Sequence, residues 1–210
     1  TLSLPGTGLP QARRFLAAVS NSSYGYFGGG QVPPTNVCTI DRIDFSNETI
    51  STPGTGLPHK RNYLAATSNS SYGYFGGGSN NPSPAGIQRL DFSNETTSGI
   101  GDLPQPRLQL AAVSSSSYGY FAGGQSPGTT AHCTIDRLDF SNETISDIGD
   151  LPQARRRLAA TSSNSYGYFA GGLAPPYVCT IDRIDFSNET ASAPGNGLPQ
   201  KRVYAAAVSN

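Results

Sequence analysis

Five arginines that recur in one motif, Leu-Pro-x-x-Arg, are the residues best suited to chemistry in this sequence. They are Arg13, Arg61, Arg107, Arg155 and Arg202. A guanidinium group is planar and offers paired N–H donors, which suit carboxylate and phosphate oxygens. More basic residues stand near the motif, namely Arg14, Lys60, Arg156, Arg157 and Lys201. The motif therefore predicts an anionic protein or glycan ligand, and the alternative is that each arginine braces its turn.

Acidic and basic side chains also recur together, as Asp41, Arg42 and Asp44 in the first copy. Arg42 and Asp44 are two residues apart, so they share one face of a strand. The equivalent pairs are Arg89/Asp91, Arg137/Asp139 and Arg183/Asp185. Glycoside hydrolysis needs carboxylates in different environments, and four equal copies are poorly suited to that. We therefore expect structural salt bridges or braced loops, and a glycosidase is disfavoured.

The sequence predicts no metal and no cofactor. Cys38, Cys133 and Cys179 occupy one equivalent position without a CxxC spacing, so we expect small buried thiols whose redox state stays open. The two histidines, His59 and His132, stand at non-equivalent places. They therefore cannot support a repeated metal or nucleophile site, and a copper-oxidase type of propeller would need more ligands.

Asn-x-Ser/Thr sequons recur along the chain. They begin at Asn47, Asn94, Asn142, Asn188, Asn21 and Asn69. Such sequons predict N-glycosylation if the protein is secreted from a eukaryotic cell. The alternative is that the first four are copies of one turn, in which Asn tolerates a left-handed backbone.

These residues lie within a repeat. Tyr-Gly-Tyr-Phe-(Gly/Ala)-Gly-Gly begins at Tyr24, Tyr72, Tyr118 and Tyr166, at spacings of 48, 46 and 48 residues. A period of this size is typical of propellers and solenoids. In the first repeat the pattern predicts strands over 15–19, 24–27, 38–45 and 48–51, with glycine and proline turns between them. We expect the tyrosines to form core between blades, with a sugar-stacking platform as the alternative.

The predicted fold is therefore an all-β propeller of four-stranded blades in a single domain, 1–210. The blades are expected over 9–52, 57–99, 103–148 and 151–192, with an extra strand over 198–208. A stray fourth strand is expected at the start, since Thr1–Ser3 match Thr49–Ser51. These stray strands suggest a window on an array of five to eight blades or, as the less favoured interpretation, assembly of several chains as a homo-oligomer.

The repeat resembles the kelch repeat. The shared features are Pro10 and Arg13 before the first strand, Gly29-Gly30 after the second, and Asp44-Phe45 (in inverted order) at the end of the third. The resemblance implies that the five motif arginines form a ring at the mouth of a central channel. It departs at the fourth strand, where kelch repeats usually carry Trp, and we expect short or thin fourth strands. The residues near that place are Ile50, Thr97, Ile145 and Ala191.

A looser similarity connects the repeats to YGYFGGG-type repeats of phage and environmental viral virion proteins. Zero net charge argues against a nucleic-acid partner, and no apolar run is long enough to span a membrane. We therefore expect a non-enzymatic binding or structural repeat module, extracellular or virion-associated, in a fibre or filament. The alternative is a glycan-binding lectin that uses the variable loops 31–36, 79–84, 125–131 and 173–177; an enzyme is the least favoured class.

Overall fold

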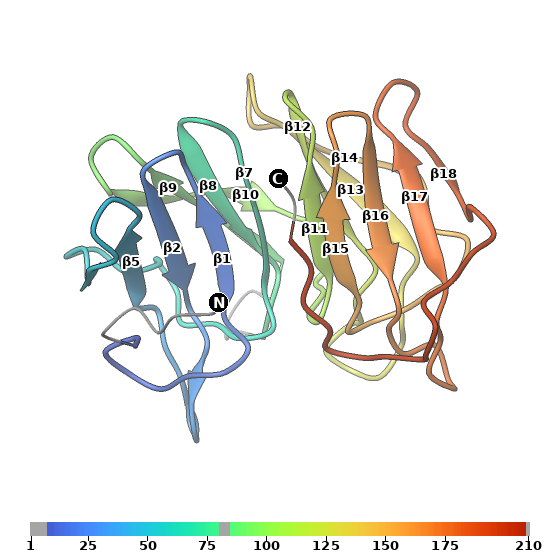
Figure 1. The fold of residues 1–210 in the computed structure, drawn as a ribbon, viewed down its shortest axis with the longest axis horizontal. Helices are drawn as coiled ribbons and strands as arrows, with labels where there is room; N and C mark the ends of the chain where they lie inside the picture. Colours follow the sequence, from blue (N-terminus) through green and yellow to red (C-terminus); the bar gives the residue numbers. More distant parts are fainter. Residues whose placement is uncertain (1–7, 80–84, 209–210) are drawn as a thin grey trace.

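The computed structural model describes residues 8–79 and 85–208, and every regular element in them is a β-strand. Four antiparallel sheets of four strands each follow one another along the chain as the blades of a β-propeller (Figure 1). The prediction of an all-β propeller is confirmed. The stray strand expected at residues 1–3 lies outside the described residues. In the described part of the chain there is no helix able to cross a membrane.

Each blade is a meander in which strands that follow one another in the blade are hydrogen-bonded neighbours. Blade 1 contains β1 (Ala17–Ser20), β2 (Tyr24–Gly28), β5 (Ile40–Asp44) and β6 (Ile50–Ser51). Blade 2 contains β7 (Ala65–Ser68), β8 (Tyr72–Gly76), β9 (Gly86–Asp91) and β10 (Thr97–Asp102). Blade 3 contains β11 (Ala111–Ser114), β12 (Tyr118–Ala122), β13 (Thr134–Asp139) and β14 (Ile145–Asp150). Blade 4 contains β15 (Ala159–Ser162), β16 (Tyr166–Ala170), β17 (Ile181–Asp185) and β18 (Thr190–Ser192). A small hairpin, β3 (Gln31–Val32) and β4 (Thr35–Asn36), occupies the first variable loop.

The fourth strands differ between blades in a way that the sequence explains. β6 and β18 are short, as expected, because Pro53 and Pro194 follow them and cannot donate to a sheet. β10 and β14 each have six residues and run past the predicted blade ends at 99 and 148. The expectation of short fourth strands was wrong there, because Gly101 and Gly149 take positive φ at a register shift and let the strand continue.

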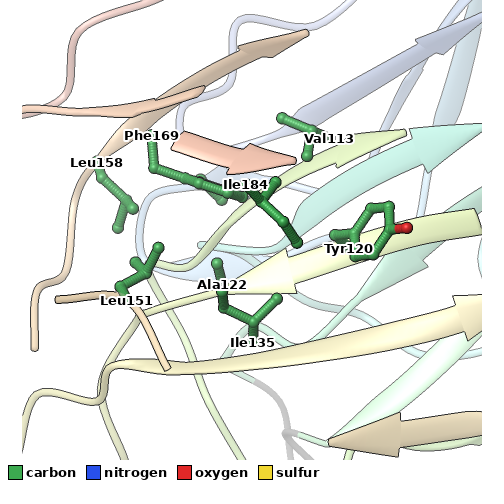
Figure 2. Packing of buried hydrophobic residues seen from close by; sticks show 9 residues of the cluster. Val113, Tyr120, Ala122, Ile135, Leu151, Leu158, Phe169 and Ile184 are labelled. Carbon is green, nitrogen blue, oxygen red and sulfur yellow. The ribbon is translucent and has the colours of Figure 1, made fainter. Parts of the chain in front are cut away.

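The hydrophobic core lies between blades. Figure 2 shows the cluster in which residues of blade 3, such as Tyr120 and Ile135, pack with Phe169 and Ile184 of blade 4. Leu151 and Leu158 of the connecting segment complete this cluster. Tyr120, Phe169 and Ile184 have no exposed surface. Burying an aromatic or branched side chain contributes roughly 1.5–3 kcal/mol, so each blade depends on its neighbour for stability.

Neighbouring blades approach so closely that the last residue of the second strand has to be small. A Cβ atom added to Gly28 would lie 2.6 Å from the ring of Phe75, and one added to Gly76 would lie 2.6 Å from the ring of Phe121. Both rings are fully buried. The last residue of the second strand is therefore limited to glycine or alanine, and Ala122, which stands there in blade 3, is itself fully buried in the cluster with Phe169.

Polar groups join the same blades nearer their rims. The carboxylate of Glu95 in blade 2 accepts hydrogen bonds from Tyr26 Oη (3.1 Å) and Arg42 Nη1 (2.6 Å) in blade 1. The ring of Phe92 stacks on Tyr26 with centroids 5.2 Å apart. The next two junctions repeat this set: Glu143 and Phe140 of blade 3 contact blade 2, and Glu189 and Phe186 of blade 4 contact blade 3. We call this set the junction contact.

Burial, the neighbouring carboxylate and the hydrogen bond to it raise the pKa of the Tyr26 hydroxyl to about 12. The same causes raise the pKa of Tyr74 and Tyr120. Each of these tyrosines therefore stays a neutral donor at physiological pH, which is the state that the junction contact requires.

The segment 198–208 was expected to be an extra strand, and in this the prediction was wrong. Leu198 donates its N–H to Cys179 O at 2.6 Å, and Gly172 donates to Arg202 O at 2.7 Å, so the segment does run along blade 4. Among the described residues no second strand pairs with it, and it therefore has no sheet to join.

Replacing Gly76 by Val tests the close approach of the blades. We expect a loss of about 1–3 kcal/mol in the free energy of unfolding, because the branched side chain overlaps the buried Phe121 ring. Urea denaturation followed by circular dichroism measures this loss. The matched control is Gly99→Val on β10, where nothing lies within 4 Å, and it should change stability by less than about 1 kcal/mol. Equal effects of the two substitutions would contradict the packing requirement.

Candidate ligand site at the mouth of the central channel

The first strands of the blades surround a central channel. β1 lies beside β7, β7 beside β11, and β11 beside β15. A cavity of about 420 Å³ between them is lined by one alanine from each repeat, together with neighbouring serines. These alanines are Ala18, Ala66, Ala112, Ala160 and Ala207. Small side chains at this position keep the channel open.

One position of the repeat forms the mouth of this channel. It stands two residues after each motif arginine and is occupied by Phe15, Tyr63, Gln109, Arg157 and Tyr204. All five residues have φ between 54° and 60°, in the left-handed region. The N–H of each donates to the carbonyl of the one before it, at 2.9, 2.9, 2.8 and 3.1 Å from Tyr63 to Tyr204. This ladder of backbone bonds holds five side chains around one opening.

The left-handed backbone is uncommon for bulky residues and costs of order 1–3 kcal/mol at each one. Such a cost persists only where the surrounding structure imposes it, and here the backbone ladder does so. Strained positions of this kind cluster at binding and catalytic sites. The mouth of the channel is therefore the strongest candidate for a functional site.

Three aromatic rings gather on one side of the mouth. The rings of Phe15 and Tyr63 stack with centroids 3.9 Å apart. The ring of Tyr204 lies 5.9 Å from Phe15 and 6.4 Å from Tyr63. A hollow of about 510 Å³ opens here, lined mainly by these rings and by leucines behind them. Burial and the neighbouring Tyr63 raise the pKa of Tyr204, so its hydroxyl is neutral.

Cationic and amide groups complete the mouth. The guanidinium carbon of Arg157 lies 4.9 Å from the centre of the Tyr204 ring, and its Nε donates to Gln109 Oε1 at 3.0 Å. Arg14 lies 5.0 Å from the centre of the Phe15 ring. The hollow thus combines stacking surfaces with two positive groups, an arrangement suited to a flat ligand that carries an anionic or acceptor group.

The motif arginines, predicted as the channel-mouth ring, mostly lie inside the blades. Arg61, Arg107 and Arg155 are fully buried, and the side chain of Arg13 has no exposed surface. Arg155 Nη2 lies 2.5 Å from Asp182 Oδ2, and Arg13 Nη2 lies 2.7 Å from Asp41 Oδ2. Only Arg202 of the five is exposed. The structure favours the turn-bracing alternative, and ligand binding by this ring stays a prediction.

The partner of the buried arginine changes from Asp to Gln in one blade. Arg107 is paired with Asp136, and it also donates to Thr134 O at 2.7 Å. Arg61 instead donates to Gly86 O at 2.6 Å, and to the side-chain oxygen of Gln88 at 3.1 Å when the Gln88 amide is oriented with its oxygen toward the guanidinium. Burial raises the pKa of Asp136 to about 6 and lowers the pKa of Arg107, so desolvation opposes this ion pair.

The Asp-Arg-x-Asp residues separate into structural roles. Arg42 bonds to Glu95 across a junction, and Asp44 Oδ1 accepts from Ser46 N at 2.8 Å. The hydrogen bonds from Ser46 lower the pKa of Asp44, which is therefore ionised at neutral pH. The structure shows both a salt bridge and a braced turn, as the sequence predicted.

The sequon asparagines lie in exposed turns. Asn47 Oδ1 accepts from Thr49 N at 3.0 Å, and Asn94, Asn142 and Asn188 repeat this bond. In these turns the residue with positive φ is the glutamate after the asparagine, not the asparagine itself. Asn21 and Asn69 accept from the backbone two and three residues ahead. Glycosylation of any of the six stays a prediction.

The three cysteines are free, partly buried thiols, one in each of blades 1, 3 and 4. Within residues 8–79 and 85–208 no group of three or more His, Cys, Asp or Glu side chains lies close enough together to hold a metal ion. Ser126 and His132 are hydrogen-bonded at 2.6 Å in the third variable loop.

Sequence reasoning placed the ligand at the arginines and missed the mouth position two residues further on. The signal was present, because this position changes type between repeats that are otherwise nearly identical. What the sequence did not show is that the five residues converge, since that depends on their left-handed backbone.

The fold and the mouth together define a repeat β-propeller with a ligand-sized hollow on its axis. Searches of protein-family profiles and of curated proteins find no match to the chain.

Substitution of Asp136 tests whether this residue holds the buried Arg107 in place. We expect Asp136→Ala to lower the free energy of unfolding by about 3–5 kcal/mol, because Arg107 then remains charged and buried without its partner. Asp136→Gln should lose much less, since Gln88 serves Arg61 at the same position of blade 2. Urea denaturation measures both variants. If the Gln variant is as unstable as the Ala variant, the bracing role assigned to this position is wrong.

Proposed function

We propose that the protein is a non-enzymatic binding module whose ligand is held at the mouth of the central channel. The blades form the rigid support, and the mouth residues supply the contacts. The proposal further places the protein outside the cell or on a virion, where a multivalent fibre or filament presents it. Repeats kept nearly identical suit equal contacts with neighbouring subunits, which supports this setting.

The observation that carries the proposal is a contrast between repeats. The residues that pack one blade on the next are nearly the same in each repeat, as at Tyr26 and Tyr74. The mouth position alone brings Phe, Tyr, Gln, Arg and Tyr together around one opening. An asymmetric set of side chains on a symmetric scaffold can recognise an asymmetric ligand. Packing would be served equally well by five identical residues.

The side chains indicate the chemistry of the ligand. A flat, partly apolar group can stack on Tyr63 and Tyr204, and Arg157 or Arg14 can bind a carboxylate, sulfate or phosphate beside it. The hollow of about 510 Å³ is within the usual size of small-molecule sites. The expected ligand is therefore an aromatic or ring-shaped group with one negative charge, carried on a protein or glycan.

Glycan binding is the second candidate, and one observation favours it. Tyr177, in the fourth variable loop, is half exposed and offers a further flat ring on which a sugar could stack. A lectin that uses the variable loops would lose affinity on a glycan array when Tyr177 is replaced, and would be indifferent to the mouth. The kelch-like identity of the repeats is likewise part of this proposal, supported by the motif arginines, the double glycines and the order of strands.

The aromatic anion 1-anilinonaphthalene-8-sulfonate is a direct probe of the mouth. We expect one molecule to bind per chain, with affinity at least tenfold weaker in Tyr63→Ala and in Arg157→Ala, because the stacking surface or the charge is lost. Fluorescence titration measures the affinity. Tyr177→Ala is the matched control, since it removes an exposed tyrosine that does not line the hollow. Unchanged binding in both mouth variants would overturn the proposal.

A further inference from the structure

The face of the propeller opposite the mouth is built from two turns in each blade. The mouth residue stands directly before the first strand, so the turns after the first and third strands lie at the other end of the blade. In Figure 1 both of these turns in blade 4 lie at the upper end of its strands. Phe186 N donates to Ser165 O at 3.0 Å and joins them, and the other blades repeat this bond. We call residues 163–166 and 185–189 together the platform of blade 4.

A groove of about 430 Å³ lies between this platform and the first turn of blade 3. Blade 3 contributes residues 115–118 to its lining, and blade 4 contributes residues 164–166 and 185–187. In blade 1 the positions equivalent to those of blade 4, residues 22–24 and 44–46, line a hollow of about 380 Å³. The repeat therefore forms a hollow at these positions in two blades, and in the groove the turn of blade 3 adds a second wall.

The carboxylate of Asp185 in this groove is fixed and charged. Its Oδ1 accepts from Ser187 N at 2.9 Å and from Ser187 Oγ at 2.7 Å. These hydrogen bonds lower the pKa of Asp185, which is therefore ionised at neutral pH. A carboxylate offers two acceptor oxygens and forms short, strong hydrogen bonds with hydroxyl groups. The groove thus holds a charged acceptor in a defined position.

Serine hydroxyls form the wall that blade 3 contributes. The turn at 115–117 consists of three serines, whereas the equivalent turns of the other three blades each contain an asparagine. Ser116 and Ser117 are exposed, and Ser165 is exposed across from them on blade 4. Each hydroxyl donates one hydrogen bond and accepts two, and small polar side chains of this kind adapt readily to a ligand.

Two half-buried tyrosines from neighbouring blades, Tyr118 and Tyr166, line the same groove. The guanidinium carbons of Arg137 and Arg183 lie 4.6 Å from the centres of the Tyr118 and Tyr166 rings, respectively, and help to hold the rings in place. A tyrosine supplies rigid, amphipathic contact surface at a low cost in conformational entropy. The groove therefore combines apolar ring surface with hydroxyl groups and one carboxylate.

We propose that this groove binds a neutral saccharide. A sugar carries several hydroxyl groups on a frame of C–H groups. Its hydroxyls match the serines and Asp185, and its C–H groups match the tyrosine rings. The carboxylate of Asp185 would repel an anionic ligand, so the groove differs in charge preference from the mouth. The groove also lies on the face opposite the mouth and the variable loops, and this inference is independent of the function proposed for either.

The test begins with the intact 210-residue chain, fluorescently labelled, on an array of neutral oligosaccharides. We expect binding to a defined set of them, and isothermal titration calorimetry with the strongest should give one site per chain. Asp185→Asn should weaken the binding at least tenfold, because the charged acceptor is lost. Ser116→Phe should weaken it as strongly, because the larger side chain fills the groove from an exposed position.

Asp139→Asn is the matched control for the carboxylate. Asp139 accepts the same two bonds from the serine in its own turn, but it does not line the groove. Thermal denaturation should therefore show similar changes in stability for Asp139→Asn and Asp185→Asn, whereas the affinity of Asp139→Asn should stay within about twofold of that of the unchanged chain. Tyr63→Ala at the mouth and Tyr177→Ala in the fourth variable loop should also leave the affinity unchanged.

The absence of binding to every neutral oligosaccharide on the array would overturn the proposal. Equal losses of affinity in Asp139→Asn and Asp185→Asn would do the same, because the effect would then come from the turns and not from the groove. A loss of affinity in Tyr177→Ala or Tyr63→Ala, with Asp185→Asn and Ser116→Phe unaffected, would place the saccharide in the variable loops or at the mouth instead.

Discussion

The close approach of one blade to the next is the constraint on which the rest of the structure depends. At the first two junctions a Phe ring of the following blade fills the space that the missing side chain of Gly28 or Gly76 leaves free, and at the third Phe169 packs in one cluster with the small Ala122. The double glycine after it turns with positive φ and donates an N–H to the carbonyl of the next motif arginine, as in Gly30 to Arg61 O at 2.8 Å. Packing, backbone bonds and the rim carboxylate act at the same junction. A blade of short strands has too little core of its own, so its stability lies in this contact.

The same constraint creates the mouth of the channel. Four of the five motif arginines are buried as braces and Arg202 is exposed, and after all five the backbone turns through a left-handed residue. The left-handed residue at this turn projects toward the axis in every repeat, from Phe15 to Tyr204. The regular scaffold thus leaves this position of each repeat free to vary, and the five side chains meet in one place. Within each repeat, the packing residues therefore stay the same while the mouth residue changes.

Much of the fold can be predicted from the sequence because the same pattern of strands and turns occurs four times. The aromatic run at Tyr24, the double glycine and the Asp-Phe-Ser-Asn turn predicted the strands of the first blade to within two residues at each end. The fourth strand is short where a proline follows it, as at Pro53, and longer where a glycine with positive φ permits a bulge, as at Gly101. The nearly constant repeat length gives no indication of this difference. The segment 198–208 has the sequence of a strand but lacks a partner in the described structure, and a strand is defined by its pairing.

The site was harder to predict for two physical reasons. An arginine beside a turn is expected to be exposed, and only the three-dimensional packing shows that Arg107 forms a buried ion pair with Asp136. Left-handed backbone is rare for Phe and Tyr, so no pattern of residue types indicates it at Phe15 and Tyr63. Sequence periodicity therefore located the repeats, while the direction of individual side chains came from the structure.

Amide hydrogen exchange, measured residue by residue by nuclear magnetic resonance, tests most directly whether the junctions unite the blades. The amides of Gly30, Gly78 and Gly124 each donate to an arginine carbonyl of the next blade at 2.8 Å, outside any strand. If the junctions hold the blades as one cooperative unit, these amides exchange as slowly as the strand amides of Tyr74 and Tyr120. If they exchange at the rate of an exposed loop residue such as Gly128, while the strand amides stay protected, the blades are independent units and the account is contradicted.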